Sequence, residues 1–171
     1  MIKVIDKHHI KTGGVMQVLV VEDDVMLADC LAEALLGDGH VVCGIASTVA
    51  EAMMLTRLHR PDVAILDMHL GGEERGSDIA DQLAQSGDLG KLGILYVTGE
   101  AERVHKEATV GHACLNKPYS FKALNAALEM VLEIAVEGRT SRPLPRGVQL
   151  LRPATLLRPE AGVLLPVGKV S

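Results

Sequence analysis

Short apolar runs alternate with longer amphipathic stretches, five times in succession, between residues 17 and 137. The apolar runs are rich in Val, Ile and Leu and have the length of buried strands, whereas the stretches between them place apolar residues at helical spacing. The predicted strands are Val18–Val21, Val41–Ile45, Val63–Leu66, Ile94–Val97 and Ala113–Leu115. The predicted helices follow them, at about Asp24–Leu36, Val49–Leu58, Ser77–Gln85, Glu100–Ala108 and from Ser120 onward.

Local signals fix the ends of some of these helices. Thr48 stands three residues before Glu51, and this spacing predicts a capping box in which each side chain binds a free backbone amide. Pro61 disfavours helical backbone at the residue before it, so the second helix is predicted to end there. Asp24 follows two other acidic residues, Glu22 and Asp23, and is better explained as a helix N-cap than as a third member of that acidic cluster.

The alternation of strands and helices predicts an α/β fold. Near-continuous apolar strands indicate a parallel sheet that is buried on both faces, so helices should cover both sides. Because crossovers between parallel strands are right-handed, the expected architecture is a doubly wound, five-stranded parallel sheet. The carboxyl ends of such strands form the crevice where ligands bind.

The two ends of the chain differ from residues 17–137, which form the predicted domain. Residues 1–16 are expected to be a poorly ordered N-terminal extension, and Met16 would serve as an alternative start. Residues 138–171 are rich in Pro, Arg and Leu. Closely spaced prolines forbid a long helix, so this tail is expected to be extended or disordered.

Charge is distributed unevenly and limits the possible partners. Residues 17–137 carry 8 basic and 20 acidic side chains, whereas residues 138–171 carry five Arg and one Lys against one Glu. An acidic domain repels nucleic acid, so the body should not contact DNA or RNA, and no DNA-binding domain is expected. The basic tail permits nucleic-acid binding, but its isolated arginines among leucines favour a non-specific tail.

The cysteines and the hydropathy indicate the compartment. Cys30, Cys43 and Cys114 form neither a CxxC motif nor a zinc spacing with His, which favours reduced thiols. No stretch approaches the roughly 18 apolar residues of a membrane-spanning helix, and the N-terminus lacks the apolar core of a signal peptide. The protein is expected to be soluble and cytoplasmic, without membrane contact.

Polar residues gather where four of the predicted strands end. Glu22 and Asp23 follow the first strand, Asp67 the third, Thr98 the fourth and Lys117 the fifth. Because these strand ends share one edge of the sheet, two acids, a carboxylate, a hydroxyl and an ammonium group should form one site.

These motifs resemble those of a response-regulator receiver domain of two-component signalling, of the single-domain type. The resemblance covers residues 17–137 and rests on Val20-Val21-Glu22-Asp23-Asp24, Ile65-Leu66-Asp67, Val97-Thr98-Gly99 and Lys117-Pro118. It implies a flavodoxin-like strand order, 2-1-3-4-5, and a phosphorelay function without conventional enzyme activity.

The resemblance also implies a role for each site residue. Asp67 would accept a phosphoryl group from a sensor histidine kinase or a histidine phosphotransfer protein, and carboxylates are known covalent nucleophiles. Lys117 would pair with a phosphoryl oxygen, and the Thr98 hydroxyl would donate to another. Mg²⁺-dependent self-phosphorylation from phosphohistidine and slow self-dephosphorylation are expected.

A divalent cation is needed because the acids crowd one another. At an effective dielectric of 20, two carboxylates 4 Å apart repel by about 4 kcal/mol, and a phosphoryl group adds further negative charge. Mg²⁺ suits such oxygen ligands. The resemblance implies that Asp23 and Asp67 bind it directly, Glu22 through water, and His69 through its backbone carbonyl.

Several positions depart from the family pattern or modify it. Cys114 stands where the family usually has the Tyr or Phe that moves inward when Thr98 moves toward the phosphate. Tyr96 is either a substitute for that aromatic residue or a core residue. The resemblance suggests that His69 and Glu100 influence how fast phosphate is lost, and Gly99 leaves room beside the site.

The leading functional hypothesis is a phosphoacceptor receiver that binds a downstream protein when phosphorylated, or acts as a phosphate shuttle or sink. Its expected contact face comprises the fourth helix, the fifth strand and the fifth helix, in a monomer or weak homodimer. The alternative is a phosphorylation-independent interaction module that uses the same fold and the C-terminal tail. A metal-dependent phosphatase would need a general acid such as Asp at position 69, which is His.

Overall fold

The structure, a computed structural model, describes residues 14–151 and 155–156. Most of the predicted N-terminal extension and the distal part of the predicted tail therefore lie outside the described residues. Within the described part, no helix combines the length and the apolar character needed to cross a membrane.

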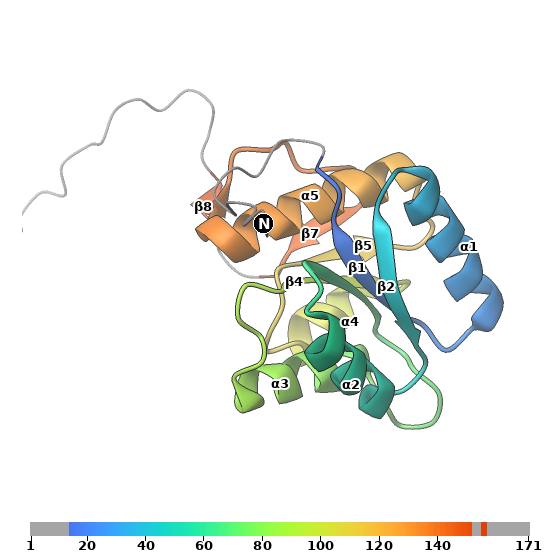
Figure 1. Ribbon diagram of the computed structural model, residues 1–171. Helices are drawn as coiled ribbons and strands as arrows, with labels where there is room; N and C mark the ends of the chain where they lie inside the picture. The colour runs from blue at the N-terminus through green and yellow to red at the C-terminus, as the bar shows by residue number, and fades with distance from the viewer. Residues whose placement is uncertain (1–13, 152–154, 157–171) are drawn as a thin grey trace, which may run out of the picture.

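The strands and helices alternate as predicted. Figure 1 shows one central sheet with helices on both sides, in the order β1 (Gln17–Val21), α1 (Val25–Gly37), β2 (Val41–Ala46), α2 (Val49–His59), β3 (Val63–Asp67), α3 (Gly76–Ser86), β4 (Gly93–Thr98), α4 (Ala101–Glu107), β5 (Ala113–Asn116), α5 (Phe121–Glu137), β6 (Arg139–Thr140), β7 (Val148–Leu150) and β8 (Thr155–Leu156).

The sheet has the strand order β2-β1-β3-β4-β5-β7. The first five strands pair in parallel, which confirms the predicted α/β fold and the order 2-1-3-4-5. A sixth strand, β7, pairs antiparallel with β5 and extends the predicted five-stranded sheet by one edge strand. The outermost strand of the sheet on the β5 side therefore comes from the predicted tail.

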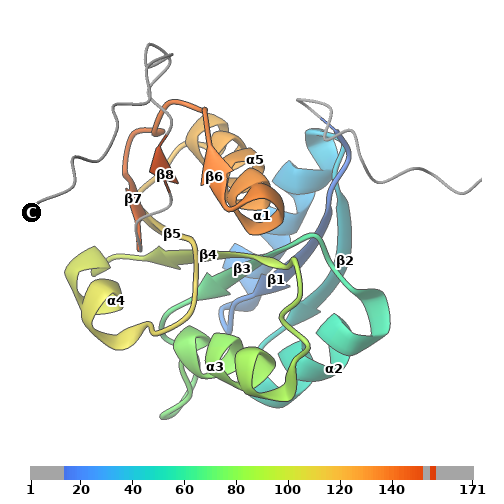
Figure 2. The same cartoon turned by 90° about the vertical axis from the view of Figure 1, so that its left-hand side faces the viewer.

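Two apolar layers hold the helices against the sheet. Side chains from α2, α3 and α4 pack on one face with Leu19, Leu66 and Tyr96, and side chains from α1 and α5 pack on the other face with Val20 and Ile65. Figure 2 shows α5 and α1 above the sheet and α2, α3 and α4 below it. Alternate residues of each strand point to opposite faces, which is why apolar residues occupy every position of a strand that is buried on both sides.

Polar caps begin several helices where the sequence indicates. The Asp24 side chain accepts hydrogen bonds from the amides of Met26 and Leu27, which confirms it as the N-cap of α1. The predicted capping box of α2 is only half formed. Thr48 accepts from the Glu51 amide, but the Glu51 carboxylate binds the Ser47 amide at 2.8 Å instead of the Thr48 amide.

α3 starts directly against the end of β3, and Gly76 makes this possible. A Cβ atom at position 76 would lie 2.2 Å from the backbone oxygen of Asp67. Only glycine lets the helix begin this close to the strand without displacing it. Asp67 is thus fixed both by β3 and by the packing of the helix that follows.

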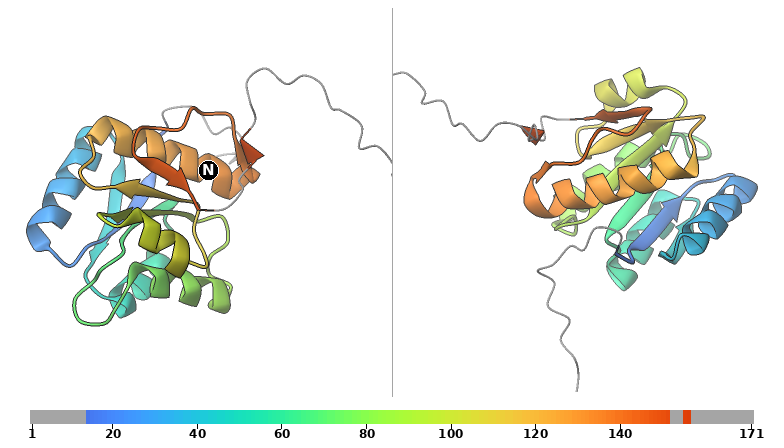
Figure 3. Two further views of the ribbon diagram at one scale, coloured as in Figure 1. Left: turned by 180° about the vertical axis from the view of Figure 1, so that it is seen from behind. Right: turned by 90° about the horizontal axis from the view of Figure 1, so that it is seen from above.

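The segment after α5 folds back along the edge of the sheet. Figure 3 shows it running beside α5 before it reaches β5 as β7. Arg142 forms ion pairs with Glu129 and Glu133 of α5. Val148 is 4% exposed and belongs to the core layer under α5. Residues 139–151 are therefore attached through both charge and apolar packing.

Candidate functional site

The four predicted strand ends meet at one edge of the sheet. Asp67 is the last residue of β3 and pairs in register with Val97 of β4. Thr98 ends β4 and pairs with Asn116 of β5, and the Lys117 amide donates to the Thr98 carbonyl at 2.8 Å. Parallel pairing alone therefore brings the carboxylate, the hydroxyl and the amine to adjacent positions.

The Lys117 ammonium group bridges two carboxylates. Its Nζ lies 2.7 Å from Oδ2 of Asp67 and 3.5 Å from Oε2 of Glu22. The Asp67 and Glu22 side chains are only 11% and 10% exposed, whereas Lys117 is 32% exposed. The structure thus joins three of the predicted site residues through direct polar contacts.

Glu22 lies in surroundings that disfavour its negative charge. Burial, together with the hydrogen bond and the negative charge of Asp67, raises the pKa of Glu22 to about 7, although the Asp24 amide and Lys117 act against this. Burial acts to lower the pKa of Lys117, but its contacts with Asp67 and Glu22 outweigh this and raise it. The Lys117 amine therefore stays positively charged, but it does not fully offset the negative potential at Glu22.

Backbone amides bind one carboxylate oxygen of Asp67 and the hydroxyl oxygen of Thr98. Oδ1 of Asp67 accepts a hydrogen bond from the His69 amide at 3.0 Å. Oγ1 of Thr98, whose residue is 1% exposed, accepts one from the Glu100 amide at 3.0 Å. In this position the Thr98 hydroxyl keeps its own hydrogen free to donate to an additional acceptor.

The sequence matches the family described as "Response regulator receiver domain" over residues 18–129. The chain belongs to this family. Receivers are the phosphoacceptor domains of two-component signalling, and histidine kinases act upstream of them. The geometry at Asp67 and the family membership therefore point to the same edge of the sheet.

Curated relatives agree with this membership. The receiver is 31% identical over 117 residues to the transcriptional regulatory protein PdtaR of Mycobacterium tuberculosis, which covers 68% of this chain and 56% of the relative. It is 30% identical over 131 residues to the transcriptional regulatory protein CutR of Streptomyces coelicolor, with 76% and 57% covered. The chain thus spans little more than half the length of these relatives.

Solved structures share the fold. The receiver superposes on the anti-anti-sigma factor PhyR of Bartonella quintana with a TM-score of 0.62 at 21% identity, over 73% of this chain and 50% of that one. It superposes on a receiver domain of a modulated diguanylate cyclase from Desulfovibrio desulfuricans G20 with a TM-score of 0.61 at 27% identity, over 74% and 100%.

The side chains of the predicted metal ligands do not form a metal site by themselves. Among residues 14–151 and 155–156, no group of three or more His, Cys, Asp or Glu side chains is gathered closely enough to hold a metal ion by itself. Asp23 is exposed, and its Oδ2 lies 3.5 Å from the place where a Cβ at Gly71 would be. A cation at this site would need backbone oxygens, water or the phosphoryl group in addition to the carboxylates.

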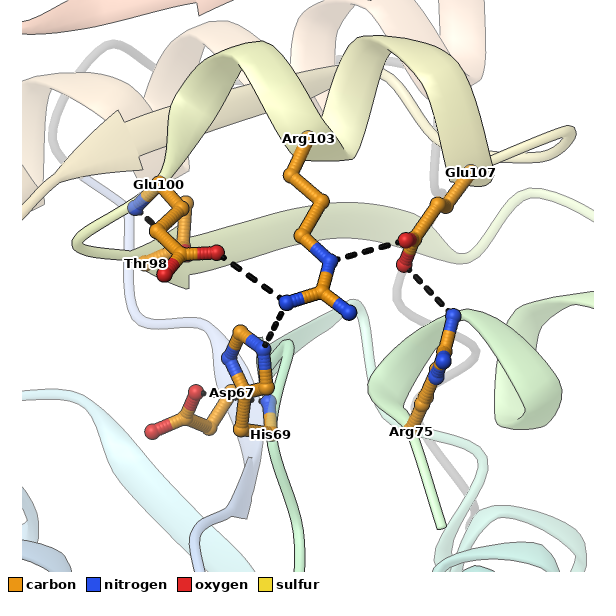
Figure 4. A network of polar contacts seen from close by, with 7 residues as sticks. All are labelled: Asp67, His69, Arg75, Thr98, Glu100, Arg103 and Glu107. Carbon is orange, nitrogen blue, oxygen red and sulfur yellow. Dashed lines mark hydrogen bonds and ion pairs between the residues drawn. The ribbon is translucent and has the colours of Figure 1, made fainter. Parts of the chain in front are cut away.

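Sequence reasoning missed a polar network beside the receiver site. Figure 4 shows Arg103 reaching from α4 toward His69, with Glu100 and Glu107 on either side of it. Its Nε donates to Oε1 of Glu107 at 2.8 Å, and Arg75 donates to the other oxygen at 2.7 Å. The four-residue spacing of Arg103 and Glu107 on one helix was the available signal for part of this network.

Tyr96 is a core residue in this structure. Tyr96 is fully buried and pairs with Cys114, also fully buried, across β4 and β5. Its hydroxyl donates to the backbone oxygen of Val110 at 2.7 Å. Gly111 provides the space for its ring, since a Cβ there would lie 2.5 Å from Cε2 of Tyr96.

The predicted contact face of the receiver is partly covered by the chain itself. β7 occupies the edge of β5, and the Leu151 amide donates to the His112 carbonyl at 3.1 Å. His105 of α4 lies 2.9 Å from the Gln149 amide oxygen of β7. The backbone edge of β5 is therefore paired, while the outer side of α4 stays exposed and α5 is exposed only at its two ends.

Proposed function

We propose that this chain is a Mg²⁺-dependent phosphoacceptor of a phosphorelay and that Asp67 is its nucleophile. The observation that carries the proposal is the 2.7 Å contact between the Lys117 amine and the Asp67 carboxylate at the end of a receiver sheet. Asp67 ends β3 and Lys117 directly follows β5, and this supports a site whose parts lie together without a phosphoryl donor.

In the proposed reaction, a carboxylate oxygen of Asp67 forms a bond to the phosphorus atom of a phosphohistidine while the phosphorus–nitrogen bond breaks. The electron pair of that bond remains on the imidazole nitrogen of the donor. Lys117 pairs with one phosphoryl oxygen, and the Thr98 hydroxyl donates to another. The protein contributes mainly position and charge.

The residues at the site fit Mg²⁺. Carboxylate and carbonyl oxygens are its preferred ligands, and the raised pKa of Glu22 reflects burial and uncompensated negative charge beside Asp67. Asp23 and Asp67 would hold the ion directly, Glu22 through water and His69 through its carbonyl oxygen. When bound, Mg²⁺ would neutralise the charge that phosphorylation adds.

We infer that a sensor histidine kinase or a histidine phosphotransfer protein supplies the phosphoryl group in the cytoplasm. A downstream protein would contact the exposed side of α4 and the exposed start of α5, because β7 already pairs with the edge of β5. The chain would act as a monomer or weak homodimer. If it has no such partner, it would serve as a phosphate shuttle or sink.

The test is phosphorylation of the wild-type chain by acetyl phosphate with Mg²⁺, followed by intact mass. One added phosphoryl group is expected in the wild type and none in Asp67→Asn. Asp38→Asn is the matched control, because Asp38 is an exposed aspartate at the end of α1. A wild-type chain that gains no phosphoryl group, or an Asp67→Asn chain that still gains one, contradicts the proposal.

A second candidate is a phosphorylation-independent interaction module. The burial of Cys114 and the hydrogen-bonded Tyr96 favour it, since neither side chain is placed to move when Thr98 moves. The same mass measurement separates the two functions, because an intact protein that stays unmodified supports the module.

A further inference from the structure

A single guanidinium group on α4 contacts two side chains beside the phosphorylation site, one at the start of the same helix and one in the loop after β3. Nη1 of Arg103 donates to Oε2 of Glu100 at 3.2 Å and lies 3.4 Å from Nε2 of His69. Nε donates to Glu107 at 2.8 Å, one turn further along α4. Figure 4 shows the guanidinium between these three side chains. Glu107 thus fixes the Arg103 guanidinium, and the guanidinium in turn contacts Glu100 and His69 next to the site.

Both residues that Arg103 holds contact the site through their backbones. The His69 amide binds the Asp67 carboxylate, and the Glu100 amide binds the Thr98 hydroxyl oxygen, each at 3.0 Å. The side chains of His69 and Glu100 are therefore placed next to the carboxylate and the hydroxyl that would contact the phosphoryl group. A residue that fixes the positions of the His69 and Glu100 side chains therefore also determines which groups lie near a water molecule that approaches Asp67.

We propose that Arg103 is a positioning residue that prolongs the lifetime of the aspartyl phosphate by holding Glu100 away from the attacking water. This inference rests on the proposed function. Arg103 contacts Glu100, His69 and Glu107 at once, so the Glu100 carboxylate is held in one place while the three contacts persist.

The chemistry that Arg103 would restrain is hydrolysis. A water oxygen forms a bond to phosphorus, the bond between phosphorus and the Asp67 oxygen breaks, and Asp67 leaves as a carboxylate with the electron pair. One proton of the water must pass to a base. A Glu100 carboxylate released from its guanidinium partner would turn toward the water and accept that proton, whereas the contact with Arg103 holds the carboxylate at the start of α4.

Arg75 provides a matched comparison. It also donates to Glu107, at 2.7 Å, and lines the same solvent-open hollow of about 710 Å³ as Arg103 and His69. Among the hydrogen bonds and ion pairs of residues 14–151, its guanidinium contacts Glu107 and neither Glu100 nor His69. Loss of Arg75 removes a cation of the same network without releasing Glu100.

The test measures how long the phosphoryl group persists. Wild type, Arg103→Met, Glu100→Gln, the double variant and Arg75→Met are loaded with acetyl phosphate and Mg²⁺, freed of donor, and followed by intact mass. Arg103→Met is expected to shorten the half-life on the order of 10-fold, below the 10²–10⁴ that a well-positioned base supplies, because Glu100 is exposed. Glu100→Gln alone and Arg75→Met should resemble the wild type.

The double variant decides the mechanism. If Arg103 acts by holding Glu100, then Glu100→Gln restores the long half-life in the Arg103→Met background, which a merely structural role of Arg103 would not do. Arg103→Lys keeps the charge with one donor group and should give an intermediate half-life, so it serves if Arg103→Met fails to fold.

Three results would overturn the inference. They are an unchanged half-life in both Arg103 variants, a short half-life that persists in the double variant, and an equal shortening in Arg75→Met. A wild-type chain that never acquires phosphate contradicts the proposed function itself. If the wild-type chain acquires phosphate but the variants give any of the three results, only the role of Arg103 is contradicted.

Discussion

The hydroxyl of Tyr96 donates to the backbone oxygen of Val110 at 2.7 Å, and this contact holds the ring inside the layer under α4. Burial raises the pKa of the Tyr96 phenol, so it stays neutral and continues to donate. Cys114 occupies the adjacent position of β5. Cys114 thus stands at the position where the family usually has a mobile aromatic side chain, and the Tyr96 ring beside it is held in place by its hydrogen bond.

Replacing Tyr96 by Phe is expected to lower stability without affecting phosphorylation. The variant leaves the Val110 carbonyl without its donor, which should reduce the free energy of unfolding by about 1–3 kcal/mol. Urea unfolding gives the change, and intact mass after treatment with acetyl phosphate gives the yield. A Tyr96→Phe chain that folds normally but gains no phosphoryl group would show that the Tyr96 hydroxyl is needed for phosphorylation.

Mg²⁺ is expected to stabilise the folded chain. An ion that binds only the native carboxylates adds about 2.7 kcal/mol at 100 times its dissociation constant. Thermal unfolding with Mg²⁺ or with EDTA measures the shift. It should shrink in Asp23→Asn and persist in Asp38→Asn, and equal shifts in both variants would place the ion elsewhere.

Stability should fall in mild acid because of His112. Burial lowers its pKa below the ordinary value of 6.5, and its Nδ1 accepts the Ile94 amide at 2.9 Å. The unfolded chain takes up a proton near that ordinary value while the folded chain resists it. The contribution to stability is therefore present above pH 6.5 and is lost as the pH falls through the lowered pKa.

The measurement is urea unfolding of wild type and His112→Asn at about pH 7.5 and about pH 5.5, on either side of the reference pKa of histidine. Asn offers an oxygen acceptor to the Ile94 amide but does not titrate. The wild type should lose more stability on acidification than the variant does, and parallel losses would assign the effect to other groups.

Removing the segment after Glu137 should destabilise the domain and promote association. The truncation removes the Arg142 ion pairs and the buried Val148 side chain, and it leaves the edge of β5 unpaired. An open strand edge is a template for pairing with another chain. A chain that ends at Leu151 serves as the control, with thermal unfolding and light scattering as readouts. Identical unfolding midpoints would make residues 138–151 dispensable.

A larger residue at position 99 is expected to change how fast the phosphoryl group is lost. A Cβ built on Gly99 meets no atom within 4 Å, so Gly99→Ala should fold without strain. Gly99→Leu would fill part of the open space through which water approaches, and a longer half-life is expected. If the half-lives of the three proteins are equal, the space beside Thr98 does not control hydrolysis.

Most of the fold was determined by local patterns in the sequence. The apolar runs at Val18, Val63 and Ile94 identify strands that are buried on both faces, because no other element of that length excludes water on two sides. Strand ends then predicted that Asp67 and Lys117 would meet, although 50 residues separate them. Parallel pairing makes this a consequence of the pattern.

Only the tertiary structure decided which side chains meet outside the strands. The antiparallel pairing of β7 with β5 depends on a return of the chain after α5, for which three residues such as Val148–Leu150 carry too weak a periodic signal. The contact of Arg103 with His69 joins α4 to the loop after β3, and loop positions follow from packing rather than from local propensity, whereas the contact of Arg103 with Glu100 lies within one helical turn. The sequence by itself therefore determined the sheet and the residues at the carboxyl ends of its strands, whereas three-dimensional packing determined how the open side of β5 is covered and what surrounds Asp67.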